Sequence, residues 1–334
     1  MRYRKLGNSD LLASKVAFGA WAIGGWTWGG SDEAEAIRAI HAAIDAGINF
    51  FDTAPVYGFG RSEEILGKAL KGKREKVIIA TKCGLVWDKK AGEFHFRSTE
   101  ETITDSGRLE IYKYLAPESL RLEVEKSLQR LQTDYIDLYQ THWPDNTTPI
   151  EETMAELVRL KKEGKIRAIG ASNVSVEQLE KYQAIGRLDT DQEKFSLIDR
   201  QKLTTNIPWC HKHQVSFLAY SPLAQGLLTG KINLDREFPP SDLRSKKPRF
   251  VLENRAFIMS FLGDIQPIAE RRNITLGQLA IAWVLNQGEH IHALVGARNV
   301  KQVQENAAAG EIVLSTEEVG FISKMIKKHG PNII

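Results

Sequence analysis

The chain has 334 residues and a formal net charge of +3, because 45 Lys and Arg residues nearly balance 42 Asp and Glu residues. These charges are scattered along the chain, whereas nucleic-acid-binding proteins usually concentrate Lys and Arg on one element, so we expect no nucleic-acid partner. The two cysteines, Cys83 and Cys210, are far apart, and the chain has neither a signal-peptide core nor an apolar run of about 18 residues, which favours a cytoplasmic protein without a disulfide scaffold or a membrane span.

The first expected element is a β-hairpin. Residues 3–6 and 14–16 flank the turn-like sequence GNSD at positions 7–10. The hairpin precedes the repeating units of the chain, and we expect it to close the floor of the fold.

Eight apolar segments follow, each succeeded by a longer amphipathic segment. The expected strands are 16–19, 49–52, 77–82, 136–140, 168–170, 192–195, 216–220 and 293–295. The expected helices are 32–46, 62–70, 117–131, 150–162, 176–185, 208–212, 276–286 and 300–308. Strands with continuous rather than alternating hydrophobicity indicate a parallel sheet buried on both faces, and eight such units close a (β/α)8 TIM barrel. No linker divides the chain, so we expect one domain over residues 1–334.

Two stretches, 84–115 and 223 to about 250, show no regular pattern. Each follows an expected strand, so in a barrel both rise from the C-terminal face, where active sites lie. The first contains Trp87, Phe94, His95 and Phe96, and we expect it to influence substrate choice.

Charged or titratable side chains end three of the expected strands. Asp52 ends one strand and Tyr57 follows it in a turn, Lys82 ends the next, and His142 follows a third. Charged groups that end buried strands cost free energy unless they are paired, so we expect them to meet at the barrel mouth. There, the Lys82 ammonium would lower the pKa of the Tyr57 phenol, and Asp52 would keep Lys82 charged. His142 could bond the phenol or a substrate oxygen, and the group could protonate a carbonyl oxygen while a cofactor delivers hydride.

These segments, DTAPVYG at 52–58, TK at 81–82 and DLYQTHWP at 137–144, resemble the aldo-keto reductases. The resemblance extends from RKLG at 4–7 to GAR at 296–298, and WTWGG at 26–30 is similar to the bacterial subgroup of general-stress and glycerol/glyceraldehyde reductases. It implies a catalytic tetrad of Asp52, Tyr57, Lys82 and His142. It also implies NADP(H)-dependent, reversible reduction of small aldehydes or ketones, with Tyr57 as general acid/base and the nicotinamide as hydride donor.

The resemblance also implies a cofactor site. Ser172 and Asn173, with Gln192, would hold the nicotinamide carboxamide, and Tyr220 would stack on its ring. The residues implied to wrap the pyrophosphate are Ser221, Leu223, Gln225 and Gly226. The other residues assigned to the cofactor are Gly19, Ala20, Trp21, Asp52, Lys231, Gly296, Arg298, Gln302, Glu305 and Asn306. The substrate pocket would be formed by Trp21, Tyr57, His142 and Trp143.

The segment GARNVKQVQEN at 296–306 resembles the part of the family that binds the adenosine end. Better-known members often have a lysine where Gly296 stands, which leaves Arg298 as the nearest basic group for a 2′-phosphate. We therefore expect NADP rather than NAD. No GxGxxG follows an early strand, which disfavours a Rossmann site.

Two other functions are compatible with parts of this pattern. The fold resembles the NADP(H)-binding β-subunits of voltage-gated potassium channels, which retain catalytic residues, and a partner surface and turnover would distinguish them. A Schiff base on Lys82 is disfavoured because Asp52 should keep that lysine charged. His211-x-His213 and His290-x-His292 lack an evident third ligand, so we expect no metal. The expected partner is a small carbonyl or alcohol substrate, and the expected state is a monomer or a weak homo-oligomer.

Overall fold

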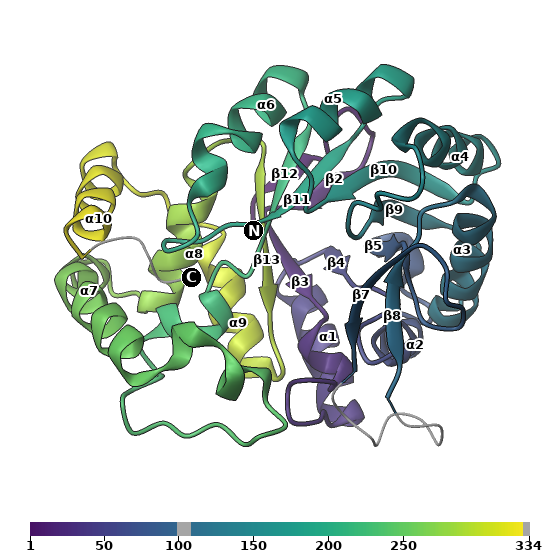
Figure 1. Cartoon of the computed structure of the whole chain (residues 1–334). Coiled ribbons are helices and arrows are strands. Elements are labelled where there is room, and N and C mark those ends of the chain that lie inside the picture. Colours follow the sequence, from purple (N-terminus) through teal and green to yellow (C-terminus); the bar gives the residue numbers. More distant parts are fainter. Residues whose placement is uncertain (99–107, 330–334) are drawn as a thin grey trace.

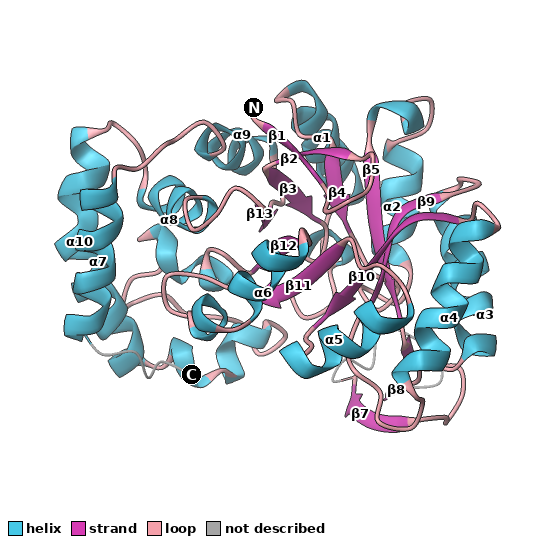
Figure 2. Ribbon diagram, turned by 90° about the horizontal axis from the view of Figure 1, so that it is seen from above, coloured by secondary structure: helices cyan, strands magenta, loops and turns pink. Residues whose placement is uncertain are grey.

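The computed structural model describes residues 1–98 and 108–329 of the chain. Eight strands form its centre, and all of them were expected from the sequence: β3 (Val16–Gly19), β4 (Phe50–Asp52), β5 (Ile78–Cys83), β9 (Ile136–Thr141), β10 (Ile166–Ser172), β11 (Thr190–Lys194), β12 (Ser216–Tyr220) and β13 (Ile291–Gly296). They pair in parallel in the closed order β10-β11-β12-β13-β3-β4-β5-β9. Figure 2 shows these strands enclosed by helices, which confirms the (β/α)8 barrel.

The expected helices surround the barrel: α1 (Glu33–Asp45), α2 (Arg61–Ala69), α3 (Pro117–Leu131), α4 (Ile150–Lys162), α5 (Val176–Ile185), α6 (Asn206–His213), α8 (Leu276–Leu285) and α9 (Val300–Ala309). Local sequence explains where several of them begin. Ser175 starts α5 and Thr275 starts α8 by capping boxes, in which each hydroxyl accepts a bond from a backbone N–H three residues later.

Two helices were not predicted. They are α7 (Leu252–Arg271) and α10 (Thr316–His329), which lie side by side at the left of Figure 1. An ion pair of Arg272 with Glu318 at 2.6 Å links the end of α7 to α10. Both helices lie outside the eight strand–helix units, so the repeat itself carried no signal for them.

The N-terminal hairpin closes the floor of the barrel, as expected. It consists of β1 (Tyr3–Lys5) and β2 (Leu12–Ser14), paired antiparallel. Leu6 and Ala13 are fully buried and pack with inward-facing barrel residues. Gly7 has φ +54°, and a Cβ there would lie 2.2 Å from the carbonyl oxygen of Asp189, next to the start of β11, so the turn requires glycine.

The prediction of irregular structure over 84–115 was wrong in part. The segment forms a three-stranded antiparallel sheet of β6 (Leu85–Val86), β7 (Glu93–Arg97) and β8 (Glu110–Lys113), and residues 99–107 lie outside the described part of the chain. In Figure 1, β7 and β8 project at the end toward which the arrows of β3 and β13 point. The stretch after Leu223 does consist of turns and short 3-10 helices as expected, among them η4 (Ala224–Thr229), η5 (Leu243–Lys246) and η6 (Pro248–Phe250). Among the described residues, no helix has the length and apolar character needed to cross a bilayer.

Candidate active site

A buried lysine lies at the centre of the barrel mouth. Lys82 is fully buried at the end of β5, and its Nζ donates to Asp52 Oδ1 at 2.7 Å, to the Thr53 carbonyl at 2.8 Å and to Tyr57 Oη at 3.2 Å. Asp52 comes from the neighbouring strand β4, so parallel pairing brings the two strand ends together. The structure thus brings Asp52, Lys82 and Tyr57 into direct contact.

The electrostatics of this group differ from the expectation in one respect. Burial raises the pKa of Tyr57 above its usual value, although Lys82 acts to lower it. Burial alone would lower the pKa of Lys82, but the adjacent Asp52 and Tyr57 raise it above its usual value. The expectation that the pKa of Tyr57 is lowered was therefore wrong. Burial destabilises the phenolate more than the nearby ammonium stabilises it. The resting state is a neutral phenol beside a charged ammonium.

His142 lies against the same phenol. Its ring meets the Tyr57 ring edge-on, with centroids 5.8 Å apart. Burial lowers the pKa of His142 well below its usual value, and the charge on Lys82 acts in the same direction. His142 is therefore neutral at physiological pH and can exchange a hydrogen bond without carrying charge.

Side-chain hydrogen bonds connect Asp52 to the ends of strands across the barrel mouth. Gln192 Nε2 donates to Asp52 Oδ2 at 2.9 Å, and the Ser172 hydroxyl donates to the Gln192 carbonyl at 2.8 Å. Asn173 Nδ2 donates to the His142 carbonyl at 2.9 Å, and Tyr220 Oη donates to Asn173 Oδ1 at 2.8 Å. Asn173 Nδ2 also donates to Ser172 Oγ at 3.0 Å, so the implied carboxamide-binding residues form a single network next to Asp52, Lys82 and Tyr57.

Two cavities meet above this network. We call the first the α9 cavity; it measures about 520 Å³, and the predicted residues that line it are Gly19, Trp21, Asp52, Tyr57, Tyr220, Ser221, Leu223, Gln225, Gly226, Lys231, Gly296, Arg298, Gln302, Glu305 and Asn306. We call the second the β7 cavity; it measures about 560 Å³, and its predicted residues are Trp21, Tyr57, His142, Trp143, Ser172, Asn173, Gln192, Tyr220, Ser221 and Gln225. Tyr57 lines both cavities, as do Trp21, Tyr220, Ser221 and Gln225, so these residues form the boundary that the two cavities share.

Two implied residues line neither cavity. Lys82 lies beneath Tyr57, as a group that acts through the phenol should. Ala20 is fully buried, with its N–H donating to the Asp52 carbonyl and its own carbonyl accepting from Ser62.

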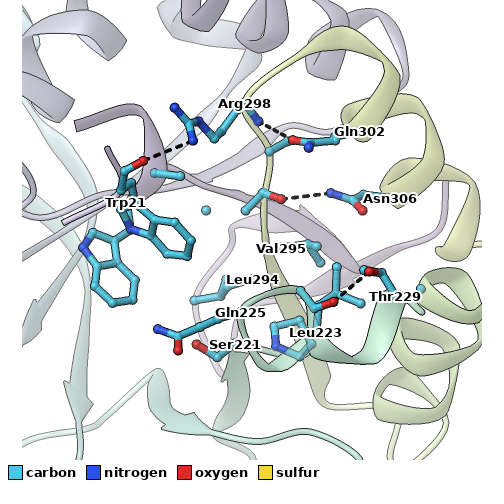
Figure 3. Close-up of a pocket in the computed structure, with 18 of the residues that line it drawn as sticks. Trp21, Ser221, Leu223, Gln225, Thr229, Leu294, Val295, Arg298, Gln302 and Asn306 are labelled. Carbon is cyan, nitrogen blue, oxygen red and sulfur yellow. Dashed lines mark hydrogen bonds between the residues drawn. The ribbon is translucent and has the colours of Figure 1, made fainter. Parts of the chain in front are cut away.

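The far end of the α9 cavity is formed by the segment after β13. Arg298 donates from Nη1 to the Trp28 carbonyl at 3.2 Å and from Nη2 to the Gly30 carbonyl at 2.7 Å, while Gln302 Oε1 accepts from the Arg298 backbone N–H at 2.8 Å. Figure 3 shows Arg298, Gln302 and Asn306 on one side of the cavity, away from Ser221 and Gln225. Arg298 thus ties two loops together, and these bonds use two of its five N–H donors.

The α9 cavity fits the phosphate-bearing part of a dinucleotide. Ser221, Gln225 and Gly226 have left-handed backbone, with φ of +55°, +58° and +98°. Successive turns of this kind direct backbone N–H groups into an anion-binding concavity. The basic side chains that line the cavity are Lys231, Arg236, Arg244 and Arg298, and the acidic ones are Asp52 and Glu305.

Several lining residues were not identified from the sequence. They include Thr229, Arg236 and Arg244 in the α9 cavity and Leu85, Lys194, Lys247 and Arg249 in the β7 cavity. A signal for some of them existed, because the run RSKKPR at 244–249 lies in a stretch already expected at the C-terminal face. Of the loop aromatics, His95 and Phe96 line the β7 cavity, while Phe94 is half exposed on the surface.

The histidine pairs lie away from these cavities. The rings of His211 and His290 are 5.4 Å apart, and His292 is buried on the barrel floor with its Nδ1 3.0 Å from the Ser14 carbonyl. Within residues 1–98 and 108–329, no three His, Cys, Asp or Glu side chains are grouped so as to hold a metal ion.

Comparison with known proteins decides the family. The model of the Aldo/keto reductase family matches residues 15–327. The chain belongs to this family. An Escherichia coli (strain K12) aldo-keto reductase relative, named NADH-specific methylglyoxal reductase, is 43% identical over 331 residues, which cover 97% of this chain and 98% of that protein.

Solved structures of aldo-keto reductases agree. The structure of the glycerol dehydrogenase AKR11B4 from Gluconobacter oxydans has a TM-score of 0.87 and 42% identity, covering 99% of this chain and 97% of that one. An aldo/keto reductase from Klebsiella pneumoniae, solved in complex with NADP and acetate, has a TM-score of 0.72 and 28% identity. The match covers 97% of this chain and 95% of that one. These relatives are enzymes, so they favour an oxidoreductase and do not support the potassium-channel alternative.

Proposed function

We propose that the enzyme reversibly reduces small aldehydes or ketones to alcohols, with Tyr57 as the general acid. The observation that carries this proposal is the bond that Tyr57 Oη accepts from Lys82 at 3.2 Å, in a residue that lines both cavities. A bound reduced nicotinamide would supply the hydride to the carbonyl carbon.

The residues of the chain would handle the proton. Tyr57 donates its phenolic proton to the carbonyl oxygen, and the phenolate that remains is stabilised by the adjacent Lys82 ammonium. Asp52 keeps that ammonium charged and in place through the 2.7 Å bond. Neutral His142 donates to or accepts from the substrate oxygen and orients it toward Tyr57. In the oxidation direction, the Tyr57 phenolate accepts the proton of the alcohol.

The residues of the α9 cavity suit the cofactor. Tyr220, which lines both cavities, would pack against the nicotinamide ring, and the turn at 221–226 would surround the pyrophosphate. Ser172, Asn173 and Gln192, which line the adjoining β7 cavity, would hold the carboxamide. The basic lining and the left-handed turn support this arrangement.

We propose NADPH as the preferred cofactor. The free N–H groups of Arg298 can bond a 2′-phosphate, and the Klebsiella pneumoniae relative was solved with NADP. NADH is the second candidate, because Arg298 already binds two carbonyl groups and the Escherichia coli relative is named NADH-specific. Dissociation constants of both cofactors for the unaltered protein would decide between them.

The chain would act as one domain over residues 1–334, and as a monomer or a weak homo-oligomer in the cytoplasm. Size-exclusion chromatography with light scattering over a range of concentrations would test the oligomeric state.

The test of the reaction is Tyr57→Phe, assayed with a panel of aldehydes, ketones and polyols. This change keeps the ring but removes the acidic oxygen, so turnover should fall by about 10²- to 10⁴-fold while cofactor still binds in a fluorescence titration. Tyr112→Phe is the matched control, because Tyr112 bonds Glu110 in β8 and lies outside both cavities. Near-normal turnover by Tyr57→Phe would rule out the assigned acid.

A further inference from the structure

The β7 cavity carries a cluster of cations that the proposed reaction does not use. Lys194 at the end of β11, Lys247 after η5 and Arg249 in η6 all line it. Of the described residues that line this cavity, none is an Asp or a Glu. The wall that receives the substrate is therefore positively charged.

Among residues 1–98 and 108–329, only part of this charge is neutralised. Asp199, buried behind the wall, accepts from Arg249 at 2.9 and 3.2 Å and pairs with Lys194 at 2.7 Å. One carboxylate thus serves two cations. The third, Lys247, donates to the neutral Gln225 amide oxygen at 3.3 Å. Burial and the charges of Arg249 and Lys194 together lower the pKa of Lys247 to about 8, although Asp199 acts to raise it.

A purely structural role explains only part of the cluster. The Arg249–Asp199 pair anchors η6 to the segment after β11, since both side chains are almost completely buried. With the described residues, Lys247 forms no comparable ion pair, and placing a cation beside two others costs free energy. An anion from outside the chain would remove that cost.

Other residues that line the cavity have a different character. Trp26, Val56, Leu85 and Phe96 belong to one apolar and aromatic cluster, against which Tyr57 packs, and His142 also lines the cavity. A molecule in this cavity therefore meets a proton donor, an apolar surface and a cationic patch. We propose that the substrate is a small carbonyl compound with an anionic group, a carboxylate or a phosphate, which Lys247 and Lys194 bind while the carbonyl faces Tyr57. This inference rests on the proposed reaction and specifies its substrate class.

Another source of anionic charge is the cofactor itself. Lys247 bonds Gln225, which lines both cavities, so Lys247 could instead serve the pyrophosphate. The two cases differ in what a Lys247 variant loses. If Lys247 binds the pyrophosphate, its loss should weaken the binding of NADH and NADPH equally, whichever substrate is used. If Lys247 binds the substrate, its loss should lower kcat/KM only for anionic substrates.

The test compares substrates that differ only in the anionic group. Pentanal is paired with 5-oxopentanoate, and glyceraldehyde with glyceraldehyde 3-phosphate, which separates carboxylate from phosphate. We expect the unaltered enzyme to have the higher kcat/KM for an anionic member. In Lys247→Met the ratio of anionic to neutral kcat/KM should fall about tenfold or more, as for loss of a charged hydrogen bond.

Lys246→Met is the matched control, because Lys246 is exposed and lies outside both cavities. Lys194→Met provides a second variant should Lys247→Met fail to fold, since the Lys194 side chain is partly exposed. An unchanged ratio in the Lys247 and Lys194 variants would overturn the proposal. Equal weakening of NADH and NADPH with an unchanged ratio would also overturn it and assign the cations to the cofactor.

A second measurement does not depend on turnover. Trp21, Trp26 and Trp143 line the β7 cavity, so ligands there should change tryptophan fluorescence. Glutarate and glycerol 3-phosphate should titrate this signal in the unaltered protein and more weakly in Lys247→Met, whereas pentanol and glycerol should not distinguish the two. If no carbonyl compound is reduced but the anions bind in this way, the proposed reaction fails while the anion site stands. If Lys247→Met binds the anions as tightly as the unaltered protein does, the proposed anion site would be ruled out.

Discussion

Lys82 Nζ lies 3.2 Å from Tyr57 Oη, yet the pKa of Tyr57 is raised rather than lowered, because burial outweighs the neighbouring charge. The phenol is therefore protonated at rest and ready to donate. The attraction between the Lys82 ammonium and Tyr57 is strongest after Tyr57 has given up its proton, because a negatively charged phenolate then lies beside the ammonium. Interactions that strengthen as the reaction proceeds are those that accelerate it.

Lys82→Met should abolish most activity and also destabilise the protein. The change leaves Asp52 as a buried carboxylate without its 2.7 Å partner, and breaking a buried pair typically costs about 3–5 kcal/mol. Denaturant unfolding and steady-state kinetics would measure both losses. The double variant Asp52→Asn with Lys82→Met should regain stability but not turnover. Trapping of a substrate adduct on Lys82 by borohydride would instead show a Schiff-base enzyme.

The pH dependence should differ between the two directions. Because the pKa of Tyr57 is raised, reduction should be insensitive to pH through neutrality and be lost as pH rises through that raised value. Oxidation needs the phenolate. At pH values below the pKa of Tyr57, the phenolate fraction increases about tenfold for each unit by which the pH is raised. His142 adds no step near neutrality, since its pKa lies well below the usual value. Profiles of kcat/KM in both directions would test this, and a fall in reduction between about pH 6 and 8 would contradict it.

Arg298→Ala should weaken NADPH by about ten- to a hundredfold and NADH by less. The phosphate bond would be lost for NADPH alone, while the ties to the Trp28 and Gly30 carbonyls would be lost for both cofactors. Fluorescence titration of each cofactor with both proteins separates the two contributions. Equal losses would show that Arg298 acts by holding the loop rather than by binding the phosphate.

Gly58→Ala should impair both stability and catalysis. Gly58 follows Tyr57 and has φ +69°, and a Cβ there would lie 2.3 Å from the Gly24 carbonyl oxygen. The Tyr57 turn would have to move away from residue 24, at a cost of about 1–3 kcal/mol for the strained backbone alone. Gly72→Ala is the matched control, because Gly72 has φ +74° and nothing within 4 Å of the added Cβ.

Thermal unfolding and kcat/KM would be measured for both glycine variants. The Gly72 variant should lose some stability and retain activity. Retention of full activity by the Gly58 variant would show that its contact with Gly24 does not position Tyr57.

The sequence alone determined the barrel strands and which strand ends carry chemistry. Each apolar run between amphipathic segments can bury its backbone only in a parallel sheet, and parallel strands bring their C-terminal ends to one face. Asp52, Lys82 and His142 follow from that geometry without knowledge of any contact.

Only the tertiary structure decided the properties that depend on several distant segments. Whether the pKa of Tyr57 rises or falls depends on how much water the packed loops exclude, which no single segment specifies. The carbonyl partners of Arg298 come from residues 28 and 30. The cation cluster joins Lys194, Lys247 and Arg249, and the carboxylate that pairs with two of them comes from Asp199. Local sequence sets backbone preferences within a segment, but burial and charge pairing arise only when separate segments pack together.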